Sequence, residues 1–432
     1  MATIPSLALI PSGYKASKVY SVLPTDGTGD FDFTRSGNAT RVNSDGLIEL
    51  VTTNVPRLNY PLIDGVVQGC PSLLLEPQRI NVIQYSEDFS QGYWTKDGSS
   101  VTSGFISPDG TANAFKIVEN SSNSFHRVGI ATFTANVYRT LSFFAKKGER
   151  NYVSLFENNT VNPARKGVIF DLENGAFYNN NESFYFNAQI ENYGNGWYRC
   201  SAYFQNTGLC VPSIGISADG LTNSYQGDGT SGIYIWGAQL EEAIYPTSYI
   251  PNYGTALGAT RSAETCNNAG DVNTFNDSEG VLFAEVSALA NDLTNRYIAI
   301  SDGTTSNRIL FRYFDGLSNS VSLFVVFGGV TQAEINYQTE DIKDTSKFAI
   351  KYKVNDFSLW VNGFEVGVDT SGSVPTGLST LSFSNAGGTL PFYGNTKQIQ
   401  YFDTALNDTD LETLTSWDSF SDMAIGQLYT IE

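Results

Sequence analysis

The sequence predicts an all-β protein, built as tandem antiparallel β-sandwiches of the jelly-roll type after a short-stranded N-terminal segment. Aromatic residues reach 13% of the chain, with 28 Phe and 24 Tyr, while charged residues reach only 16%. Disordered chains are poor in aromatics and rich in charge, so this composition indicates a folded protein. Short apolar runs alternate with Gly, Asn, Ser and Thr, as in strands joined by tight turns.

Length and charge limit what the chain can do. With 432 residues it exceeds the usual size of one domain, so about three units are expected. The 25 basic and 44 acidic residues give a net charge of -19, which repels nucleic-acid phosphates and anionic membranes. The start, MATIPSLALIPSGYK, lacks a basic region, and Pro5 and Pro11 interrupt its apolar stretch. We therefore expect no nucleic-acid partner, no membrane insertion and no signal peptide.

Residues 1–85 contain short strand candidates interrupted by the turn formers TDGTGD, NSDG and IDG. Such brief strands bury little apolar surface on their own. Residues 86–262 then carry a full alternating series, which predicts a two-sheet jelly roll. Its segments include RTLSFFAKK, NYVSLFE, KGVIFDLENGAFY, GWYRCSAYFQN, VPSIGISA and GIYIWGAQLE. Trp197 and Trp236 lie inside these strands, where a core or interface position is expected.

Residues 263–415 predict a second sandwich, with the boundary near residues 258–278. The phrase SLWVNGFEVG, which contains Trp360, predicts a hairpin at its Asn-Gly turn. FDTALNDTDLETL predicts a short helix with Asn407 or Asp408 as its N-cap and with leucines 406, 411 and 414 on one face. Residues 416–432 are expected to form a tail or a partner-docking strand.

Three phrases connect the chain to a known group of proteins. NATRVNSDGLIE, CPSLLLEPQRINVIQYSEDFS and SGIYIWGAQLEEAIYPTSYIPN together resemble a recurrent β-rich segment of structural and host-adhesion proteins of tailed bacteriophages. The resemblance covers about residues 30–262. It implies a place in the virion, on a tail fibre or as a head fibre, with residues 1–85 as a virion-docking or oligomerisation segment. The open alternative is that residues 1–85 form a β-extension packed on the next domain.

Two further resemblances concern the sandwiches. An opening Trp strand, GNGWYR and a closing IYIWGAQLE are similar to carbohydrate-binding modules of the galactose-binding-like jelly-roll type. Residues 263–415 resemble laminin-G or concanavalin-like lectin domains. Together these resemblances imply binding of a host cell-surface glycan. Many such modules hold a structural calcium through an aspartate of the closing strand, where this chain has Trp236 and Gly237. No metal or other cofactor is predicted.

The sequence offers little for catalysis. His126 is the only histidine, and its strand context in NSFHRVGI favours a structural role. Glycoside hydrolysis needs two facing carboxylates, and the Glu-x-Asp-x-(x)-Glu strand of concanavalin-like glycosidases is absent. QIQYFDTA only faintly resembles a polysaccharide-lyase strand, with Gln400 in place of the histidine. We predict no catalytic residue and no enzymatic activity.

A glycan site needs exposed aromatic rings that stack on a sugar face, with amides and carboxylates that bind its hydroxyls. The loop from Phe177 to Tyr185 combines both kinds of side chain, and YWTK offers two more rings. The alternative is that the two tyrosines of the loop cap the sandwich edge and are buried. The predicted glycan-binding residues are Tyr178, Asn179, Asn180, Asn181, Glu182, Tyr185, Tyr93 and Trp94.

Cysteines and loop aspartates receive structural interpretations. The cysteines are too far apart for a zinc knuckle, so reduced, mostly buried thiols are expected, with a Cys200–Cys210 bridge as the alternative. The aspartates are interpreted as solvated turns, with a lectin-type calcium as the alternative. The cysteines are Cys70, Cys200, Cys210 and Cys266, and the aspartates are Asp302, Asp315 and Asp369.

The combined prediction is a non-enzymatic phage virion protein, assembled in the bacterial host cytoplasm, that displays glycan-binding modules for host attachment. Its expected partners are other virion proteins, a host glycan and further copies of itself. A trimer is favoured because runs such as SVSLFVVFGG and ESFYFNA need covering. One alternative is a tail depolymerase or lyase whose acidic pair forms between chains. The other is a secreted bacterial glycan-binding protein, against which the missing signal peptide argues.

Overall fold

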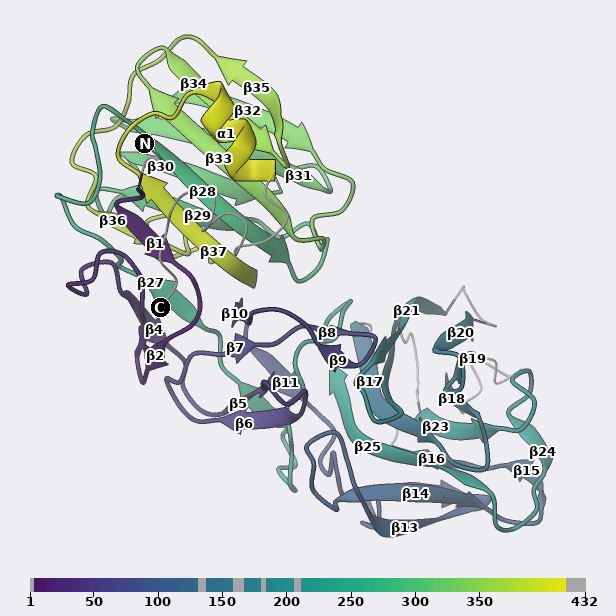
Figure 1. Cartoon of the computed structure of the whole chain (residues 1–432). Coiled ribbons are helices and arrows are strands. Elements are labelled where there is room, and N and C mark those ends of the chain that lie inside the picture. Colours follow the sequence, from purple (N-terminus) through teal and green to yellow (C-terminus); the bar gives the residue numbers. More distant parts are fainter. Residues whose placement is uncertain are drawn as a thin grey trace.

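The computed structural model describes residues 4–130, 137–157, 167–179, 184–205, 211–314 and 316–416. Figure 1 shows two β-sandwiches with the N-terminal segment, drawn in purple, between them. We call these parts the N-terminal segment (residues 4–85), the middle sandwich (residues 86–262) and the C-terminal sandwich (residues 263–416). Among the described residues α1 (Asp408–Ser416) is the single α-helix and all other regular elements are strands. The prediction of an all-β fold is confirmed.

The middle sandwich consists of two six-stranded antiparallel sheets. The first has the order β12 (Thr95–Asp97), β16 (Arg127–Gly129), β23 (Pro212–Ser217), β18 (Tyr152–Glu157), β19 (Gly167–Asp171) and β20 (Ala176–Asn179). The second has the order β13 (Ser99–Phe105), β14 (Ala114–Glu119), β25 (Gly232–Glu241), β17 (Tyr138–Lys147), β22 (Trp197–Gln205) and β21 (Tyr185–Asn192). Phe143, Phe170 and Ile235 fill the core between the sheets. Two short pairs complete this part: β15 (Asn123–Phe125) with β24 (Ser224–Gln226), and β11 (Arg79–Asn81) with β26 (Ala259–Arg261).

The C-terminal sandwich also consists of two antiparallel sheets. The five-stranded sheet has the order β32 (Val330–Gln338), β31 (Ser320–Phe327), β30 (Arg308–Tyr313), β29 (Arg296–Ser301) and β36 (Thr380–Ser382). The eight-stranded sheet begins with β35 (Phe364–Asp369), β34 (Asp356–Val361), β33 (Ser346–Lys353), β28 (Glu279–Ala288) and β37 (Gly394–Phe402). Its remaining strands are β10 (Ser72–Leu75), β7 (Leu58–Asn59) and β1 (Leu7–Leu9).

Strands of the N-terminal segment therefore complete the C-terminal sandwich. Leu7 to Leu9 pair with Tyr401 to Ile399 of β37, and β10 pairs with the earlier part of the same strand. Leu7, Leu9 and Leu73 are fully buried in the core of this sandwich. The N-terminal segment thus gains its apolar burial by adding to a distant part of the chain.

Other strands of the N-terminal segment form small sheets around the junction. One sheet has the order β2 (Tyr14–Lys15), β3 (Lys18–Val19), β4 (Phe31–Thr34) and β27 (Thr265–Asn267). The two hairpins are β5 (Ala39–Val42) with β6 (Ile48–Val51), and β8 (Leu62–Ile63) with β9 (Val66–Val67). Figure 1 shows β8 and β9 beside the middle sandwich. The segment therefore contacts both sandwiches.

Two local predictions are confirmed. Asn362 and Gly363 connect β34 to β35 with φ of 47° and 89°, the positive values that a two-residue hairpin turn requires. At α1 the backbone N–H of Asp410 donates to Oδ1 of Asn407 at 3.0 Å, so Asn407 is the N-cap. Leu411 and Leu414 of the helix pack on Trp360 and Phe283, which covers the outer face of the eight-stranded sheet.

The run SVSLFVVFGG does not form an open edge. It contains β31, which lies between β30 and β32 and is largely buried. The expectation that this run needs a partner chain is wrong, because neighbouring strands of the same sheet already satisfy its backbone. The run ESFYFNA leads into β21, which is an edge strand.

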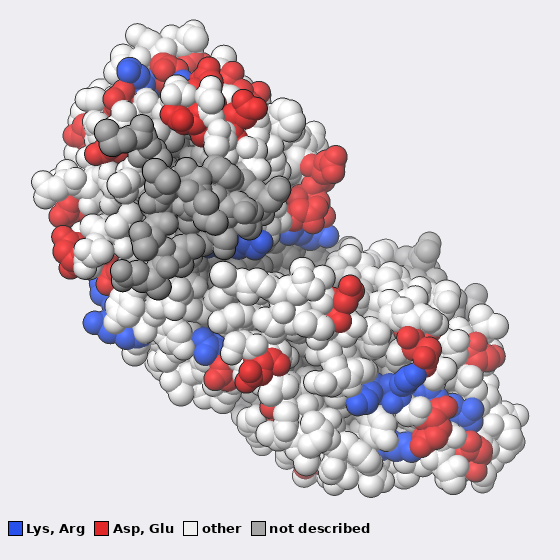
Figure 2. All heavy atoms as spheres, in the orientation of Figure 1, with Lys and Arg blue, Asp and Glu red and all other residues white. Residues whose placement is uncertain are grey.

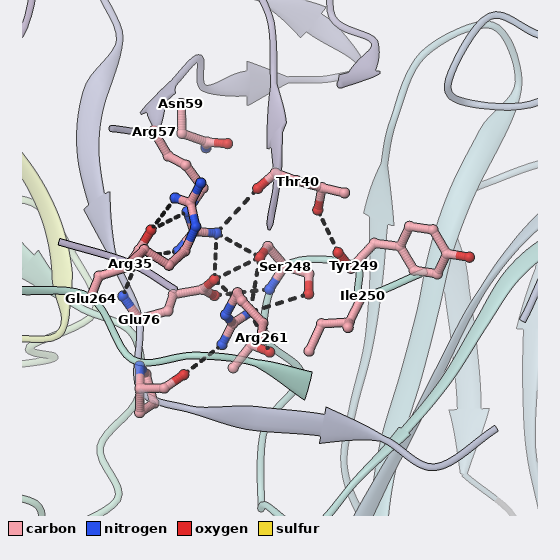
Figure 3. Close-up of polar contacts among 12 residues, drawn as sticks. Arg35, Thr40, Arg57, Asn59, Glu76, Ser248, Tyr249, Ile250, Arg261 and Glu264 are labelled. Atoms are coloured by element: carbon pink, nitrogen blue, oxygen red, sulfur yellow. Dashed lines mark hydrogen bonds and ion pairs between the residues drawn. The ribbon is translucent and has the colours of Figure 1, made fainter. Parts of the chain in front are cut away.

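A buried ion network holds the three parts together (Figure 3). Arg57 donates to Glu76 at 2.6 Å and makes a two-pronged contact with Glu264. Arg35 donates to Glu264 at 2.8 Å, and Arg261 lies 2.7 Å from Glu76. These residues come from the N-terminal segment and from the connection between the sandwiches. Because every charge in the network has an opposite partner, it can be buried without an isolated ion.

Figure 2 shows how charge is distributed on one face. Acidic side chains gather along the upper rim of the C-terminal sandwich, and most Lys and Arg on this face lie close to Asp or Glu. None of the described helices is long and apolar enough to cross a membrane.

Candidate functional site

A cavity of about 430 Å³ opens where the N-terminal segment and the two sandwiches meet. We call it the junction pocket. Thr40, Val42 and Asn59 line it from the N-terminal segment, and Asn291 and Asn395 line it from the C-terminal sandwich. The middle sandwich lines it with β17, β21, β22, Tyr193 and residues 244–249. Further lining residues are Arg41, Ile48, Leu74 and Glu76 of the N-terminal segment and Leu289, Ala290 and Lys343 of the C-terminal sandwich. A volume of this size falls in the range of small-molecule sites, about 300–1,000 Å³.

The middle sandwich presents the outer face of its second sheet to the pocket. In β22, Cys200, Ala202 and Phe204 point into the core. Side chains alternate along a strand, so Arg199 and Tyr203 point to the opposite face, where both line the pocket. The alternation of apolar and polar residues along β22 therefore gives this strand one face in the core and one face in the pocket.

A β-bulge shapes the wall formed by β21. The register between β21 and β22 shifts between Phe186 and Gln189, and Asn187 adopts φ of 48°. A bulge inserts an extra residue and redirects the side chains beside it, and bulges occur often next to functional sites. Here the bulge lets the consecutive residues Phe186 and Asn187 lie on the same face, and Asn187 and Gln189 both line the pocket.

The amides of Asn187 and Gln189 are available to a ligand. Neither side chain makes a hydrogen bond within the described part of the chain. Each amide offers donors and an acceptor in a fixed plane, which suits neighbouring hydroxyls of a sugar. By contrast, Asn59 accepts from the backbone N–H of Val42 at 2.8 Å, and its amide oxygen is already engaged.

An aromatic platform continues the pocket along the same face. We use this name for Tyr138, Phe186 and Tyr203. The rings of Phe186 and Tyr203 stack with centroids 5.3 Å apart, and Tyr138 meets Tyr203 edge-on at 5.8 Å. Phe186 is 36% exposed and Tyr138 is 45% exposed. Exposed rings held by neighbouring strands form a rigid surface on which an apolar sugar face can stack.

The floor of the pocket is charged but internally compensated. The Arg199 guanidinium donates to the carbonyl oxygen of Thr247 at 2.6 Å and lies 5.6 Å from the ring centre of Phe144. Glu191 stands opposite Arg199 in the β21–β22 register. Burial raises the pKa of Tyr193 to about 12, so its hydroxyl stays protonated at neutral pH.

The two cations at the rim are also paired. Arg41 contacts Glu49 at 2.8 Å, and Lys343 contacts Asp341 at 3.1 Å. A pocket whose cations already have carboxylate partners offers little attraction to an anionic ligand. The lining is therefore suited to uncharged, hydroxyl-rich molecules.

The loop predicted to bind glycans is only partly described. Tyr178 lies on the edge strand β20 and is 51% exposed. Tyr185 is 1% exposed and packs against Phe184 and Phe204, so its ring is part of the core and offers no face to a ligand. Asn179 is the last residue of β20. The other predicted members of the loop, Asn180, Asn181 and Glu182, lie outside the described residues.

The second predicted pair, Tyr93 and Trp94, belongs to the interior of the middle sandwich. The Trp94 ring is buried beside Phe89, and its indole N–H donates to the backbone oxygen of Tyr85 at 2.9 Å. Tyr93 is half-buried against Tyr85 and Trp94. Both rings directly precede β12, which lies at the opposite edge of the first sheet from the β20 strand that carries Tyr178.

His126 is part of the structure of the middle sandwich. Its Nδ1 lies 2.6 Å from the carbonyl oxygen of Gly98, and its Nε2 lies 3.2 Å from that of Tyr225. Its ring is buried and packs against the ring of Tyr225. The interpretation of His126 as a structural residue is confirmed.

The aspartates and cysteines are placed as follows. Asp302 accepts from Thr304 and Asn307, as expected for a turn, and Asp369 accepts from Ser371. No group of three or more His, Cys, Asp or Glu residues is placed to hold a metal ion in the part of the chain that the structure covers. Three described cysteines are free thiols: Cys200 and Cys266 are buried, while Cys70 is exposed. Asp315 and Cys210 lie outside the described residues.

The pocket residues on β21 and β22 were not predicted from the sequence. A signal for Tyr203 was present, because it shares the parity of Arg199 and Ser201 in GWYRCSAYFQN and must lie on their polar face. No local signal indicated the bulge at Asn187 or the residues that the other two parts contribute to the pocket.

Comparisons with known proteins give weak similarities only. No protein-family model matches the chain, and no curated protein matches it. The CBM40 module of the Ruminococcus gnavus IT-sialidase, bound to α2,3-sialyllactose, is 13% identical over 32% of this chain and 84% of that chain, with a TM-score of 0.28. Domain 4 of a Geobacillus stearothermophilus GH43 arabinanase, in complex with arabinotriose, is 11% identical over 35% and 73%, with a TM-score of 0.28. Domains LG4-5 of the mouse laminin α1 chain are 11% identical over 77% and 92%, with a TM-score of 0.24. Similarities at this level do not identify a ligand.

Proposed function

We propose that the protein is a non-catalytic glycan-binding protein whose site is the junction pocket with its aromatic platform. The observation that carries the proposal is the position of two unengaged amides, Asn187 and Gln189, beside the exposed rings of Phe186 and Tyr138. Amides that bind hydroxyls and rings that stack on a sugar face are the two components that carbohydrate recognition needs.

The charges of the pocket favour an uncharged glycan. Arg41 and Lys343 are neutralised by their own partners, and Arg199 stands opposite Glu191. The energy of binding then comes from stacking and neutral hydrogen bonds, which depend little on salt.

The geometry supports binding more than hydrolysis. Glu76 and Glu191 are the carboxylates of the junction pocket. Although burial alone would raise its pKa, the guanidinium groups of Arg261 and Arg57 lower the pKa of Glu76 to about 2. Such a group cannot serve as a general acid near neutral pH. Glu191 stands opposite Arg199, and Glu76 is the one other carboxylate among the described residues that line this pocket, whereas glycoside hydrolysis needs two facing carboxylates in acid and base roles.

The proposal extends to the biological setting. The sequence resemblance to structural and host-adhesion proteins of tailed bacteriophages supports a place in a virion, where binding modules attach the particle to a bacterial surface polysaccharide. Multiple copies on one particle would raise weak single-site binding to useful avidity. Immunogold labelling of intact particles with an antibody against this chain tests the location, and labelling absent from every particle structure would refute it.

A glycan array followed by calorimetry tests the binding function. The purified chain is expected to bind neutral bacterial surface glycans. Phe186→Ala should weaken the best of them about tenfold, or about 1.4 kcal/mol. Asn187→Gly removes an amide while keeping the positive φ that glycine adopts freely, and should also weaken binding. Tyr337→Ala, a half-exposed tyrosine on β32 of the C-terminal sandwich, is the matched control. An array without hits, or equal losses for Tyr337→Ala, contradicts the proposal.

A further inference from the structure

A second cavity lies directly beside the junction pocket. It measures about 510 Å³ and shares four lining residues with the first: Val42, Asn59, Glu191 and Tyr193. We call it the outer pocket. Shared walls make the two cavities adjacent sections of one groove between the N-terminal segment and the middle sandwich.

Strand β21 runs along the whole of this groove. Phe186 belongs to the platform, Gln189 lines the junction pocket, and Asn192 lines the outer pocket. Six residue steps in a strand, at about 3.3 Å each, span about 20 Å. This length accommodates several sugar rings in a row, whereas one monosaccharide would fill only one section.

The far wall of the groove depends on a close backbone approach. The β8–β9 hairpin, with Gly65 at its turn, packs on the turn that follows β21. A Cβ on Gly65 would meet the backbone N of Gly194 at 2.6 Å, and Gly65 has φ of 78°. Only glycine permits this contact, so the hairpin is fitted against the middle sandwich at the end of the groove.

The outer pocket selects by charge. Asp64 and Glu191 line it, and the described residues of its lining include no Lys or Arg. Both carboxylates are exposed and can accept hydrogen bonds from sugar hydroxyls, while they repel a carboxylated or phosphorylated sugar. Tyr60 and Tyr198 supply aromatic surface to the same section.

We propose that the platform, the junction pocket and the outer pocket form one extended groove that binds an internal stretch of a linear, uncharged polysaccharide. This inference rests on the proposed glycan-binding function and defines its substrate class as a chain of several sugars. Each section contributes contacts to a different sugar ring, and the acidic outer pocket excludes anionic repeats.

The test is calorimetry on a length series of the neutral glycan that the array identifies, from monosaccharide to octasaccharide. The affinity is expected to rise stepwise with length and to level off once the groove is filled. Tyr60→Ala, in the outer pocket, should remove the gain of the longer oligosaccharides while leaving the affinity for the shorter ones unchanged. Phe364→Ser, at an exposed position on β35 far from the groove, is the control for solubility and folding.

The possible failures are distinguishable. If no member of the series binds, the proposed function itself fails. If the monosaccharide binds as tightly as the octasaccharide, the groove is refuted while glycan binding stands. If the octasaccharide gains affinity but Tyr60→Ala keeps the whole gain, the outer pocket takes no part and the extended groove is refuted. Equal binding of an oligosaccharide with a uronic acid in every repeat would overturn the charge selection.

Discussion

Arg57 and Glu264, which are 207 positions apart in the chain, form a two-pronged ion pair in which both side chains are completely buried. Arg57 precedes the middle sandwich and Glu264 follows it. The pair therefore closes the chain around that sandwich and fixes the entry and exit strands beside the junction pocket.

Removing one partner of this ion pair should lower the free energy of unfolding. Arg57→Leu leaves the buried carboxylates of Glu76 and Glu264 without one of their counter-charges, and such changes cost about 3–5 kcal/mol. We expect the first unfolding transition in urea, followed by tryptophan fluorescence, to move to a lower concentration. Lys343→Ala is the control, because Lys343 and its partner Asp341 are 44% and 34% exposed, and it should cost less than about 1 kcal/mol. Equal effects of the two substitutions would show that the network does not stabilise the junction.

Acid should loosen the junction. Burial favours the neutral form of Glu76, but attraction to Arg261 and Arg57 outweighs it, and its pKa falls from 4.5 to about 2. A carboxylate with a depressed folded-state pKa contributes stability above its unfolded pKa and loses that contribution as the pH falls toward the folded value. The melting temperature should therefore decline between about pH 4.5 and pH 2. In Glu76→Gln this part of the decline should be absent, and a decline of the same size in that variant would assign it to other carboxylates.

The first strand should stabilise the C-terminal sandwich specifically. Leu9 is fully buried in its core, so Leu9→Ala should cost about 2–5 kcal/mol. Ile4→Ala serves as the control because Ile4 is 64% exposed, and its effect should stay within about 0.5 kcal/mol. Scanning calorimetry should show a shift of one transition in Leu9→Ala, with the transition of the middle sandwich unchanged. A shift of both transitions would mean that the two sandwiches unfold together.

The thiols should differ sharply in reactivity. Cys70 is exposed, whereas burial raises the pKa of the Cys200 and Cys266 thiols and shields them from reagents. A brief maleimide treatment of the native protein, read by peptide mass spectrometry, should modify Cys70 and spare the two buried residues. The same treatment in urea provides the control, because all three should then react. Native labelling of Cys200 would contradict the packing of β22.

Local chemistry made part of this fold predictable. The Asn362-Gly363 turn and the Asn407 cap each depend on a few adjacent residues, and the structure shows both. The pairing of Leu9 with Ile399 has no local signal, because it depends on an edge of β37 that exists only after the sandwich has formed. The same limit explains why residues 1–85 could be assigned only to alternative roles.

The candidate site was also predictable only in part. The alternation of side chains in GWYRCSAYFQN places Tyr203 on the polar face of its strand. A pocket needs a second surface as well, and here Val42, Asn59 and Asn395 supply it from other parts of the chain. Parity also fails at the bulge of β21, where the consecutive residues Phe186 and Asn187 both lie on the outer face. The many tyrosine and asparagine residues indicated a site built from aromatic rings and amides, but they did not indicate which of these residues form it.

The pairing of β1 and β10 with β37 decides how the protein can be cut into fragments for expression. A fragment starting at residue 263 would leave one side of β37 with unpaired backbone groups and a core without Leu7, Leu9 and Leu73. Open edges of this kind recruit strands from other molecules and lead to aggregation. A soluble C-terminal fragment therefore has to carry its missing strands on a fused peptide. A fragment of the middle sandwich has to begin before β11, because β11 pairs with β26 and Ile83 is buried in the core of this sandwich.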